Sequence, residues 1–108
     1  MPTRYDKLIR DRIPEIMDEA GVDYELEVLE EDDFDRALRT KLCEEATEAA
    51  EATTRAELVK ELADLQEVVA TLVALAGIEA DEVDRVQTER RHDRGAFERR
   101  LYLKSTTP

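Results

Sequence analysis

Apolar residues recur at helical spacing over most of the chain. Intervals of three or four residues between them, typical of one face of an α-helix, are found in four stretches: 14–20, 34–52, 55–76 and 81–93. Gly21 and Gly77 follow two of these stretches, and glycine is the residue preferred just after a helix C-terminus. The pattern predicts an all-α, mainly helical fold.

A different pattern follows the first predicted helix. Between 22 and 28, Val22, Tyr24, Leu26 and Val28 alternate with acidic residues. Alternation with a period of two predicts a short strand or an extended link. The residues 101–103, Leu-Tyr-Leu, are the candidate partner for this segment.

The turn between the two longest stretches lies at Thr53 and Thr54, which interrupt an alanine-rich run. The residues from Thr54 to Glu57 have the Ser/Thr-x-x-Glu form of a capping box, in which each side chain accepts a hydrogen bond from the backbone N–H of the other residue. A new helix should therefore begin near Arg55. Helices joined by so short a turn form an antiparallel hairpin.

Acidic residues form two clusters, one on each side of this turn: Glu44, Glu45 and Glu48 before it, and Glu61 and Asp64 after it. Residues three apart share a face of a helix, so Glu45 pairs with Glu48, and Glu61 pairs with Asp64. Both pairs should lie at a similar height in the hairpin and face each other. Four carboxylates arranged in this way predict a metal site.

The apolar stripes of the two helices predict that these pairs border the hydrophobic seam. Glu45 takes the place of a core residue in the stripe of Phe34, Leu38, Leu42 and Ala49. The second stripe, which Glu61 and Asp64 flank, consists of Leu58, Leu62, Leu65, Val69, Leu72 and Ala76. Unpaired carboxylates there would lose hydration, and only Lys41 and Lys60 are close enough in sequence to neutralise them.

A hard cation is the expected partner. Mg²⁺, with Mn²⁺ as a substitute, suits a site in which all ligands are carboxylate oxygens and neither His nor Cys takes part. The alternative is a solvated acidic helix face, because charged residues make up 41% of the chain. Either cluster alone would favour that alternative, whereas two inward-facing clusters one hairpin apart favour a metal site.

These motifs resemble a known superfamily. Residues 41–48 (KLCEEATE) and 61–64 (ELAD) are similar to the EExxE and ExxD motifs of the MazG-like all-α nucleoside triphosphate pyrophosphohydrolases. Residues 5–15 (YDKLIRDRIPE) and 94–101 (RGAFERRL) resemble the phosphoribosyl-ATP pyrophosphohydrolase-like branch, although that branch usually has two glycines where this chain has Gly95 and Ala96.

The resemblance implies a magnesium-dependent hydrolase that cleaves a nucleotide between its α and β phosphates, releasing a nucleoside monophosphate and pyrophosphate. It implies Glu45, Glu48, Glu61 and Asp64 as metal ligands. Glu44 and Glu45 are the catalytic candidates. Glu44 either orients or deprotonates the attacking water, or lies in an outer layer or on the surface.

Positive charge for the phosphates has to come from outside the acidic clusters. Between Arg85 and Lys104 there are seven Lys or Arg residues and three acids, which either serve a helix C-terminus or bind phosphate. The substrate-binding candidates are Lys7, Arg10, Lys41, Arg91, Arg94 and Gly95.

The length of 108 residues and the lack of a linker or repeat predict one domain, 1–108. A single cysteine, no signal peptide and no long apolar run predict a cytoplasmic protein that does not enter a membrane. The net charge of -12 argues against nucleic-acid binding.

The second long helix also predicts self-association. Of its 22 residues from Arg55 to Ala76, 14 are apolar, more than one small chain can cover. A homodimer or homotetramer, with the hairpin packed in an oligomeric helix bundle, is expected.

Three functions fit the sequence. The first is a nucleoside triphosphate pyrophosphohydrolase that removes unwanted nucleotides. The alternative within the same chemistry is hydrolysis of phosphoribosyl-ATP in histidine biosynthesis, and the alternative from another class is a non-catalytic helical interaction or regulatory protein.

Overall fold

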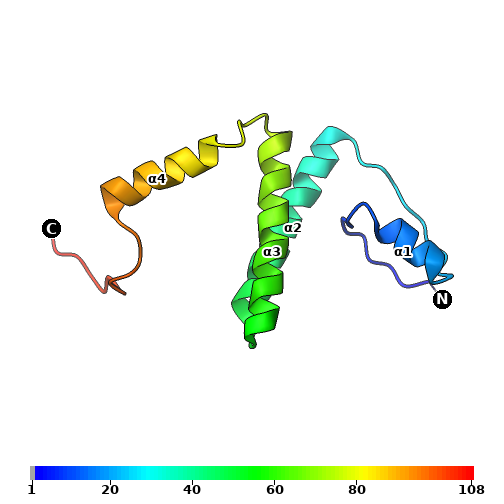
Figure 1. Ribbon diagram of the computed structural model, residues 1–108, viewed down its shortest axis with the longest axis horizontal. Helices are drawn as coiled ribbons and strands as arrows, with labels where there is room; N and C mark the ends of the chain where they lie inside the picture. The colour runs from blue at the N-terminus through cyan, green and yellow to red at the C-terminus, as the bar shows by residue number, and fades with distance from the viewer. Residues whose placement is uncertain (1) are drawn as a thin grey trace.

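The computed structural model describes residues 2–108 and shows an all-α protein (Figure 1). This part of the chain contains no strand, and its helices are α1 (Ile13–Glu19), α2 (Glu31–Glu51), α3 (Arg55–Leu75) and α4 (Glu82–Arg94). The helical fold class predicted from the sequence is confirmed. Each helix lies where the apolar periodicity placed it, with bounds that differ by up to three residues.

The largest difference in bounds is at the start of α2, which begins at Glu31 rather than at residue 34. The added turn carries Glu31, Asp32 and Asp33. Negative side chains in a first turn interact favourably with the N-terminal end of the helix dipole. The acids therefore extend the helix beyond its first apolar position.

The turn between α2 and α3 contains the predicted cap in a modified form. The hydroxyl of Thr54 accepts a hydrogen bond from the backbone N–H of Glu57 at 3.1 Å. The Glu57 carboxylate accepts from the backbone N–H of Thr53 at 3.2 Å, one residue before the donor of a capping box. Both bonds satisfy backbone N–H groups at the point where α3 begins.

The far end of α3 is closed by Gly77, which has a φ of 70°. The backbone N–H of Ile78 donates to the carbonyl of Val73, and that of Gly77 donates to the carbonyl of Ala74, both at 3.1 Å. This pair of bonds is a Schellman motif, which requires the left-handed conformation that glycine adopts without strain. The predicted end of the helix at Gly77 is thus explained by its hydrogen bonds.

Among the described residues, α2 and α3 are the two helices that pack against each other, and they form the antiparallel hairpin at the centre of Figure 1. Their shared core is small: Leu38 is 4% exposed and Val68 is 8% exposed. On α3, Leu58, Leu62 and Val69 remain exposed. The predicted α3 stripe is therefore only partly buried, because packing on α2 covers one side of a helix that is apolar around most of its surface.

The alternating segment 22–28 contains no helix and forms no strand within the described chain. The expectation that residues 101–103 lie against it is wrong for a single chain. α4 leads away from the hairpin, and the C-terminal segment ends on the opposite side of the molecule from α1 and the segment that follows it (Figure 1). Leu101 and Leu103 are accordingly exposed.

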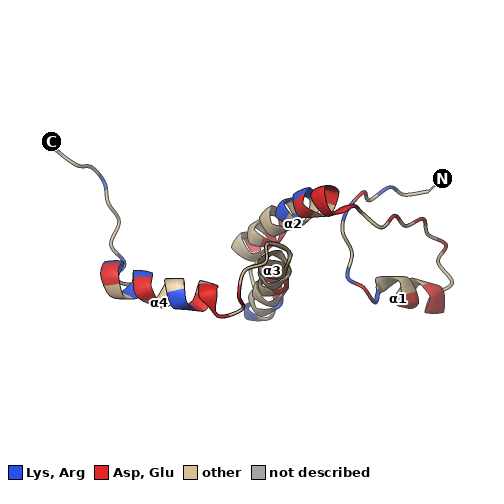
Figure 2. Cartoon of the chain, turned by 90° about the horizontal axis from the view of Figure 1, so that it is seen from above, with Lys and Arg blue, Asp and Glu red and all other residues tan. Residues whose placement is uncertain are grey.

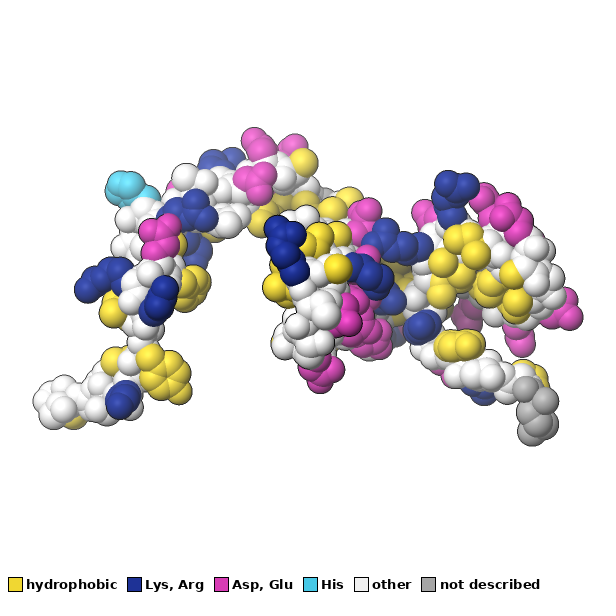
Figure 3. All heavy atoms as spheres, turned by 60° about the horizontal axis from the view of Figure 1, so that its bottom comes forward, with side chains coloured by type: hydrophobic (Ala, Val, Ile, Leu, Met, Phe, Trp, Pro, Cys, Tyr) yellow, Lys and Arg dark blue, Asp and Glu magenta, His cyan; other side chains and the backbone are white. Residues whose placement is uncertain are grey.

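The chain is much more open than a compact domain of its size. Its radius of gyration is 18.6 Å, whereas about 13 Å is typical for a compact chain of this length. Its accessible surface is 10259 Å², against about 6,100 Å² for a compact monomer of this mass. Figure 3 shows hydrophobic side chains open to solvent over the centre and both ends of the molecule. No described helix is long and apolar enough to cross a membrane.

Candidate metal centre

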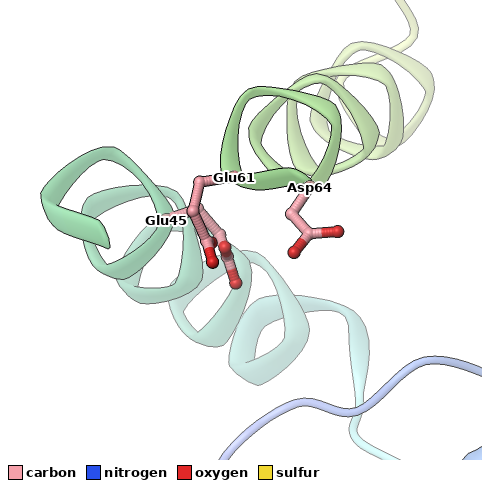
Figure 4. A group of neighbouring side chains, drawn as sticks. All are labelled: Glu45, Glu61 and Asp64. Atoms are coloured by element: carbon pink, nitrogen blue, oxygen red, sulfur yellow. The ribbon is translucent and has the colours of Figure 1, made fainter. Parts of the chain in front are cut away.

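Three of the four predicted metal ligands meet between the packed helices. Glu45 comes from α2, and Glu61 and Asp64 come from α3 one turn apart. One carboxylate oxygen from each residue lies within 4.8 Å of the others. Figure 4 shows the three side chains pointing into the same space beside the hairpin. The structure thus brings together three of the four acids that the hairpin argument placed opposite each other.

Burial makes this group chemically unusual. Glu45 is only 7% exposed, and it is the one charged or polar residue of the described chain that is buried. Its Oε2 atom has no hydrogen-bond partner, and neither has Oε2 of Glu61. Buried polar atoms are nearly always satisfied, since an unsatisfied one costs free energy. These two oxygens therefore fit the ligands of a cation.

Basic side chains neutralise part of the remaining charge. Lys41 Nζ lies 3.6 Å from Glu45 Oε1, and Lys60 Nζ lies 3.2 Å from Glu61 Oε1 and 3.3 Å from Asp64 Oδ2. The hydrogen bonds to Glu61 and Asp64 raise the pKa of Lys60, which stays charged. The three carboxylates face these two lysines and also Arg10, whose Nη2 lies 2.8 Å from Asp64 Oδ1, so a divalent ion would bind here in place of at least one of these cations.

The fourth predicted ligand, Glu48, lies beside Glu61 but outside the three-residue group. Hydrogen bonding with the Glu61 carboxyl, together with the charge of Glu45, raises the pKa of Glu48. The same bond, assisted by Lys60, lowers the pKa of Glu61. Glu48 and Glu61 also line one hollow together, so Glu48 is a neighbour of the group but not a member of it.

Glu44 occupies the outer side of α2. It is exposed and, with Glu48, lines an open hollow that also involves Thr40, Cys43 and Thr47. The two glutamates are four residues apart and share a helix face. Glu44 therefore lies beside Glu48 on the solvent side of α2 and is not a member of the three-residue group.

Some of the predicted phosphate-binding residues contact the acidic group, and others lie apart from it. Arg10 reaches the centre and donates a hydrogen bond from Nη2 to Asp64 Oδ1 at 2.8 Å, and Lys41 contacts Glu45. Lys7 is exposed, with its Nζ over the ring of Tyr5 at 5.3 Å. Within one chain it makes no contact with the acidic group.

The basic residues of α4 lie elsewhere. α4, which carries Arg91 and Arg94, does not pack on the hairpin in the described chain, and Figure 2 shows it extending away from α2 and α3. Gly95 is the C-cap of α4: its φ is 83°, and its N–H donates to the carbonyl of Arg91 at 2.8 Å. These three residues do not join the candidate metal centre of their own chain.

Lys60, which bridges Glu61 and Asp64, was named in the sequence prediction as a candidate counter-charge, and its spacing of four residues from Asp64 explains the contact. One feature of the centre was missing from that prediction. The contact of Arg10 with Asp64 joins residues 54 positions apart. No local pattern indicates such a pairing.

The donors fit a hard divalent ion. All three members of the group offer carboxylate oxygen. Oxygen-only sites favour Mg²⁺ and Mn²⁺ over zinc, which is usually bound with His or Cys. The residues at this position therefore fit the ion that the sequence motifs predict.

Comparison with known proteins adds evidence independent of this geometry. A sequence model of the family described as phosphoribosyl-ATP pyrophosphohydrolase matches residues 3–91. No curated protein and no solved structure gives a significant match. The matched region contains the N-terminal segment, the complete hairpin with its carboxylates and most of α4, and it confirms the resemblance drawn from the motifs. The chain therefore belongs to the phosphoribosyl-ATP pyrophosphohydrolase family, whose members are hydrolases that act on phosphoanhydride bonds.

Proposed function

We propose that this protein cleaves a nucleotide 5′-triphosphate between its α and β phosphates, with a divalent ion held by the hairpin. The observation that carries the proposal is the buried Glu45, whose unpartnered Oε2 lies in a group with Glu61 and Asp64. A buried and unsatisfied carboxylate weakens a fold, so its presence here is better explained by a ligand than by packing.

The proposed roles of the acids follow from their positions. Glu45, Glu61 and Asp64 hold the ion, which is Mg²⁺ with Mn²⁺ as a substitute, and Glu48 moves in from beside Glu61 as the fourth ligand. When bound, the ion supplies charge neutralisation of the triphosphate and Lewis-acid activation at phosphorus. Glu44, on the solvent side of the same helix, accepts the proton of the attacking water.

The reaction forms one bond and breaks one. The oxygen of a water molecule bonds to the α or the β phosphorus. The bond between that phosphorus and the α–β bridging oxygen breaks, and its electron pair stays on the bridging oxygen of the leaving group. The water proton goes to a carboxylate oxygen of Glu44. The products are a nucleoside monophosphate, or its phosphoribosyl derivative, and pyrophosphate.

Two substrates are compatible with this chemistry. The sequence motifs favoured free nucleoside triphosphates and a role in removing unwanted nucleotides, whereas the name of the matched family favours phosphoribosyl-ATP and histidine biosynthesis. The match stops at residue 91, before Arg94, Gly95 and Ala96. Membership of an enzyme family sets aside the non-catalytic alternative.

Association of chains is part of the proposal. About 4,000 Å² of surface above that of a compact monomer is open in each chain, and the candidate cations Lys7, Arg91 and Arg94 stand apart from their own acidic group. A second copy in a homodimer or homotetramer would cover apolar surface on α3 and bring such cations to the site. The single domain expected over 1–108 would then be stable only in the assembly.

The test is pyrophosphate release, measured with phosphoribosyl-ATP and with a panel of ribo-, deoxyribo- and damaged nucleoside triphosphates. Each substrate is assayed with Mg²⁺, with Mn²⁺ and with a chelator. Release that needs the divalent ion supports the proposal, and the ranking of kcat/KM separates the biosynthetic from the nucleotide-clearing role. Release of orthophosphate in place of pyrophosphate, or undiminished release in chelator, would contradict it.

A further inference from the structure

Asp64 differs from the other two acids of the metal centre. Both of its oxygens are engaged by cations: Oδ1 accepts from Arg10 Nη2 at 2.8 Å, and Oδ2 accepts from Lys60 Nζ at 3.3 Å. Glu45 and Glu61 each keep one buried oxygen without a partner. An ion that uses all three residues therefore finds free ligand atoms on two of them, and has to displace a cation from the third.

Lys60 and Arg10 are held in different ways. Lys60 lies one turn before Asp64 on α3 and also pairs with Glu61. It therefore stays close to the group even if Asp64 binds an ion. Arg10 belongs to residues 2–12, which precede α1 and contain no helix. Among the described hydrogen bonds and ion pairs, the Arg10–Asp64 contact is the one that joins this segment to the hairpin. Figure 4 shows the N-terminal segment, in blue, on the side to which the carboxylates point.

We propose that Arg10 holds the place of the divalent ion at Asp64, and that it exchanges Asp64 for a substrate phosphate when the ion binds. The proposal rests on the metal centre proposed above and adds a regulatory step to it. The Arg10 side chain is 58% exposed, whereas that of Asp64 is 25% exposed. A partly exposed ion pair contributes little net stability, so this contact can be given up readily.

The released guanidinium is suited to the second half of the exchange. It would lie beside the metal centre, where a triphosphate bound to the ion must also lie. A guanidinium binds two phosphate oxygens at once in a geometry that a lysine does not reproduce. Arg10 thus competes with the ion in the free protein and assists substrate binding once the ion is present.

The first experiment is titration of the full-length protein with Mg²⁺ and with Mn²⁺ by calorimetry, without nucleotide. Arg10→Ala should bind either ion about two- to fivefold more tightly than the natural protein, because a competitor for Asp64 has been removed. The matched control is Arg12→Ala, since Arg12 lies in the same segment but pairs with Glu15 at 3.3 Å. This control should bind the ions as the natural protein does. Helix content measured by circular dichroism verifies that both variants fold.

The second experiment observes the guanidinium groups directly by NMR of the arginine Nε–H signals. The Arg10 signal, assigned by its loss in Arg10→Lys, should shift on addition of Mg²⁺ and shift again on addition of a non-hydrolysable triphosphate. The Arg12 signal should not follow it. Unchanged or weaker ion binding by Arg10→Ala, or an Arg10 signal that does not shift on addition of Mg²⁺, would overturn the proposed exchange by Arg10. Neither result would contradict the proposed metal centre. Absence of ion binding by the natural protein overturns both proposals.

Discussion

Glu45 places a charge in the position of α2 where the apolar stripe calls for a hydrophobic residue, and the packing of α3 then buries it. A buried carboxylate oxygen without a hydrogen-bond partner, such as Glu45 Oε2, carries a desolvation cost that folding has to offset. The natural sequence therefore keeps a group that disfavours folding of the ion-free chain. Stability and function should be separable at this one residue.

Glu45→Leu is expected to raise the stability of the protein in chelator by about 1–3 kcal/mol, the cost of an unsatisfied buried polar group, since the partly exposed Lys41 can turn to solvent. It should weaken Mg²⁺ binding and pyrophosphate release at least about 100-fold, because loss of a direct ligand matters more than loss of a residue that only orients a ligand. Thermal unfolding, calorimetry and turnover measure the three effects. The matched control is Glu67→Leu, the same change at an exposed glutamate of α3, which should retain ion binding. Full activity of Glu45→Leu would contradict the proposed centre.

Glu48 gives the site a pH dependence. Its pKa is raised by the hydrogen bond to Glu61 and by the charge of Glu45, so without the ion it keeps its proton to a higher pH than an ordinary glutamate does. Glu61 has a lowered pKa and stays ionised over the same range. Binding of the ion by Glu48 must expel this proton.

Apparent Mg²⁺ affinity should consequently fall as the pH falls through the raised pKa of Glu48, and ion binding should release protons there. Calorimetry in two buffers with different ionisation enthalpies counts the protons released. Glu48→Gln cannot release a proton and serves as the control. Proton release that is unchanged in Glu48→Gln would exclude Glu48 as its source.

The acids of the site were predictable at the residue scale because they belong to one hairpin. Helical spacing put Glu61 and Asp64 on one face, and the missing apolar position at Glu45 indicated its burial, which the structure shows. The contact of Arg10 with Asp64 was not predictable, since it depends on how residues 2–12 fold back on α3. The position of α4 was not predictable either, because its sequence does not indicate whether it packs on the hairpin or extends away from it.

At the scale of the elements, the turn at Thr53 and Thr54 sets the height at which the two acidic helices face each other. Thr54→Ala removes the acceptor for the Glu57 N–H and should cost about 1 kcal/mol of stability. For a chain of this size that corresponds to a fall in Tm of about 4–8 °C. Thermal unfolding by circular dichroism measures it.

Thr53→Ala is the matched control for this cap. The Thr53 backbone N–H, which donates to Glu57, survives the change, and its hydroxyl lies 3.5 Å from Glu57, a long contact. Thr53→Ala should therefore lower Tm clearly less than Thr54→Ala does. Equal falls in Tm for the two substitutions would show that the Thr54 hydroxyl has no special part in starting α3.

The bounds of the helices were predictable for the same local reasons. Thr54 and Gly77 bracket α3, and Gly95 ends α4, all through hydrogen bonds between near neighbours. The packed face of α3 was predicted less well. Its periodicity contains more apolar positions than one neighbouring helix can cover, so the sequence alone could not select the side that meets α2.

At the scale of the whole molecule, the surface left open on α3 predicts association. Sedimentation should give a mass of at least two chains at micromolar concentration, and Val69→Asp, a charge on exposed apolar surface, should shift the protein toward single chains. Tm should rise with protein concentration if folding and association are linked. A single-chain mass for the natural protein, with a Tm independent of concentration, would contradict this prediction.

The hairpin also determines the order in which the protein can assemble. α2 and α3 are joined by a short turn, and contacts between near neighbours in sequence form faster than those between distant segments or separate molecules. We therefore expect the carboxylates to come together during folding before another copy, a nucleotide or the N-terminal segment binds. Lys41 and Lys60, which lie on the same two helices, are the counter-charges available at that moment. They allow the newly made chain to close its hairpin without first capturing an ion.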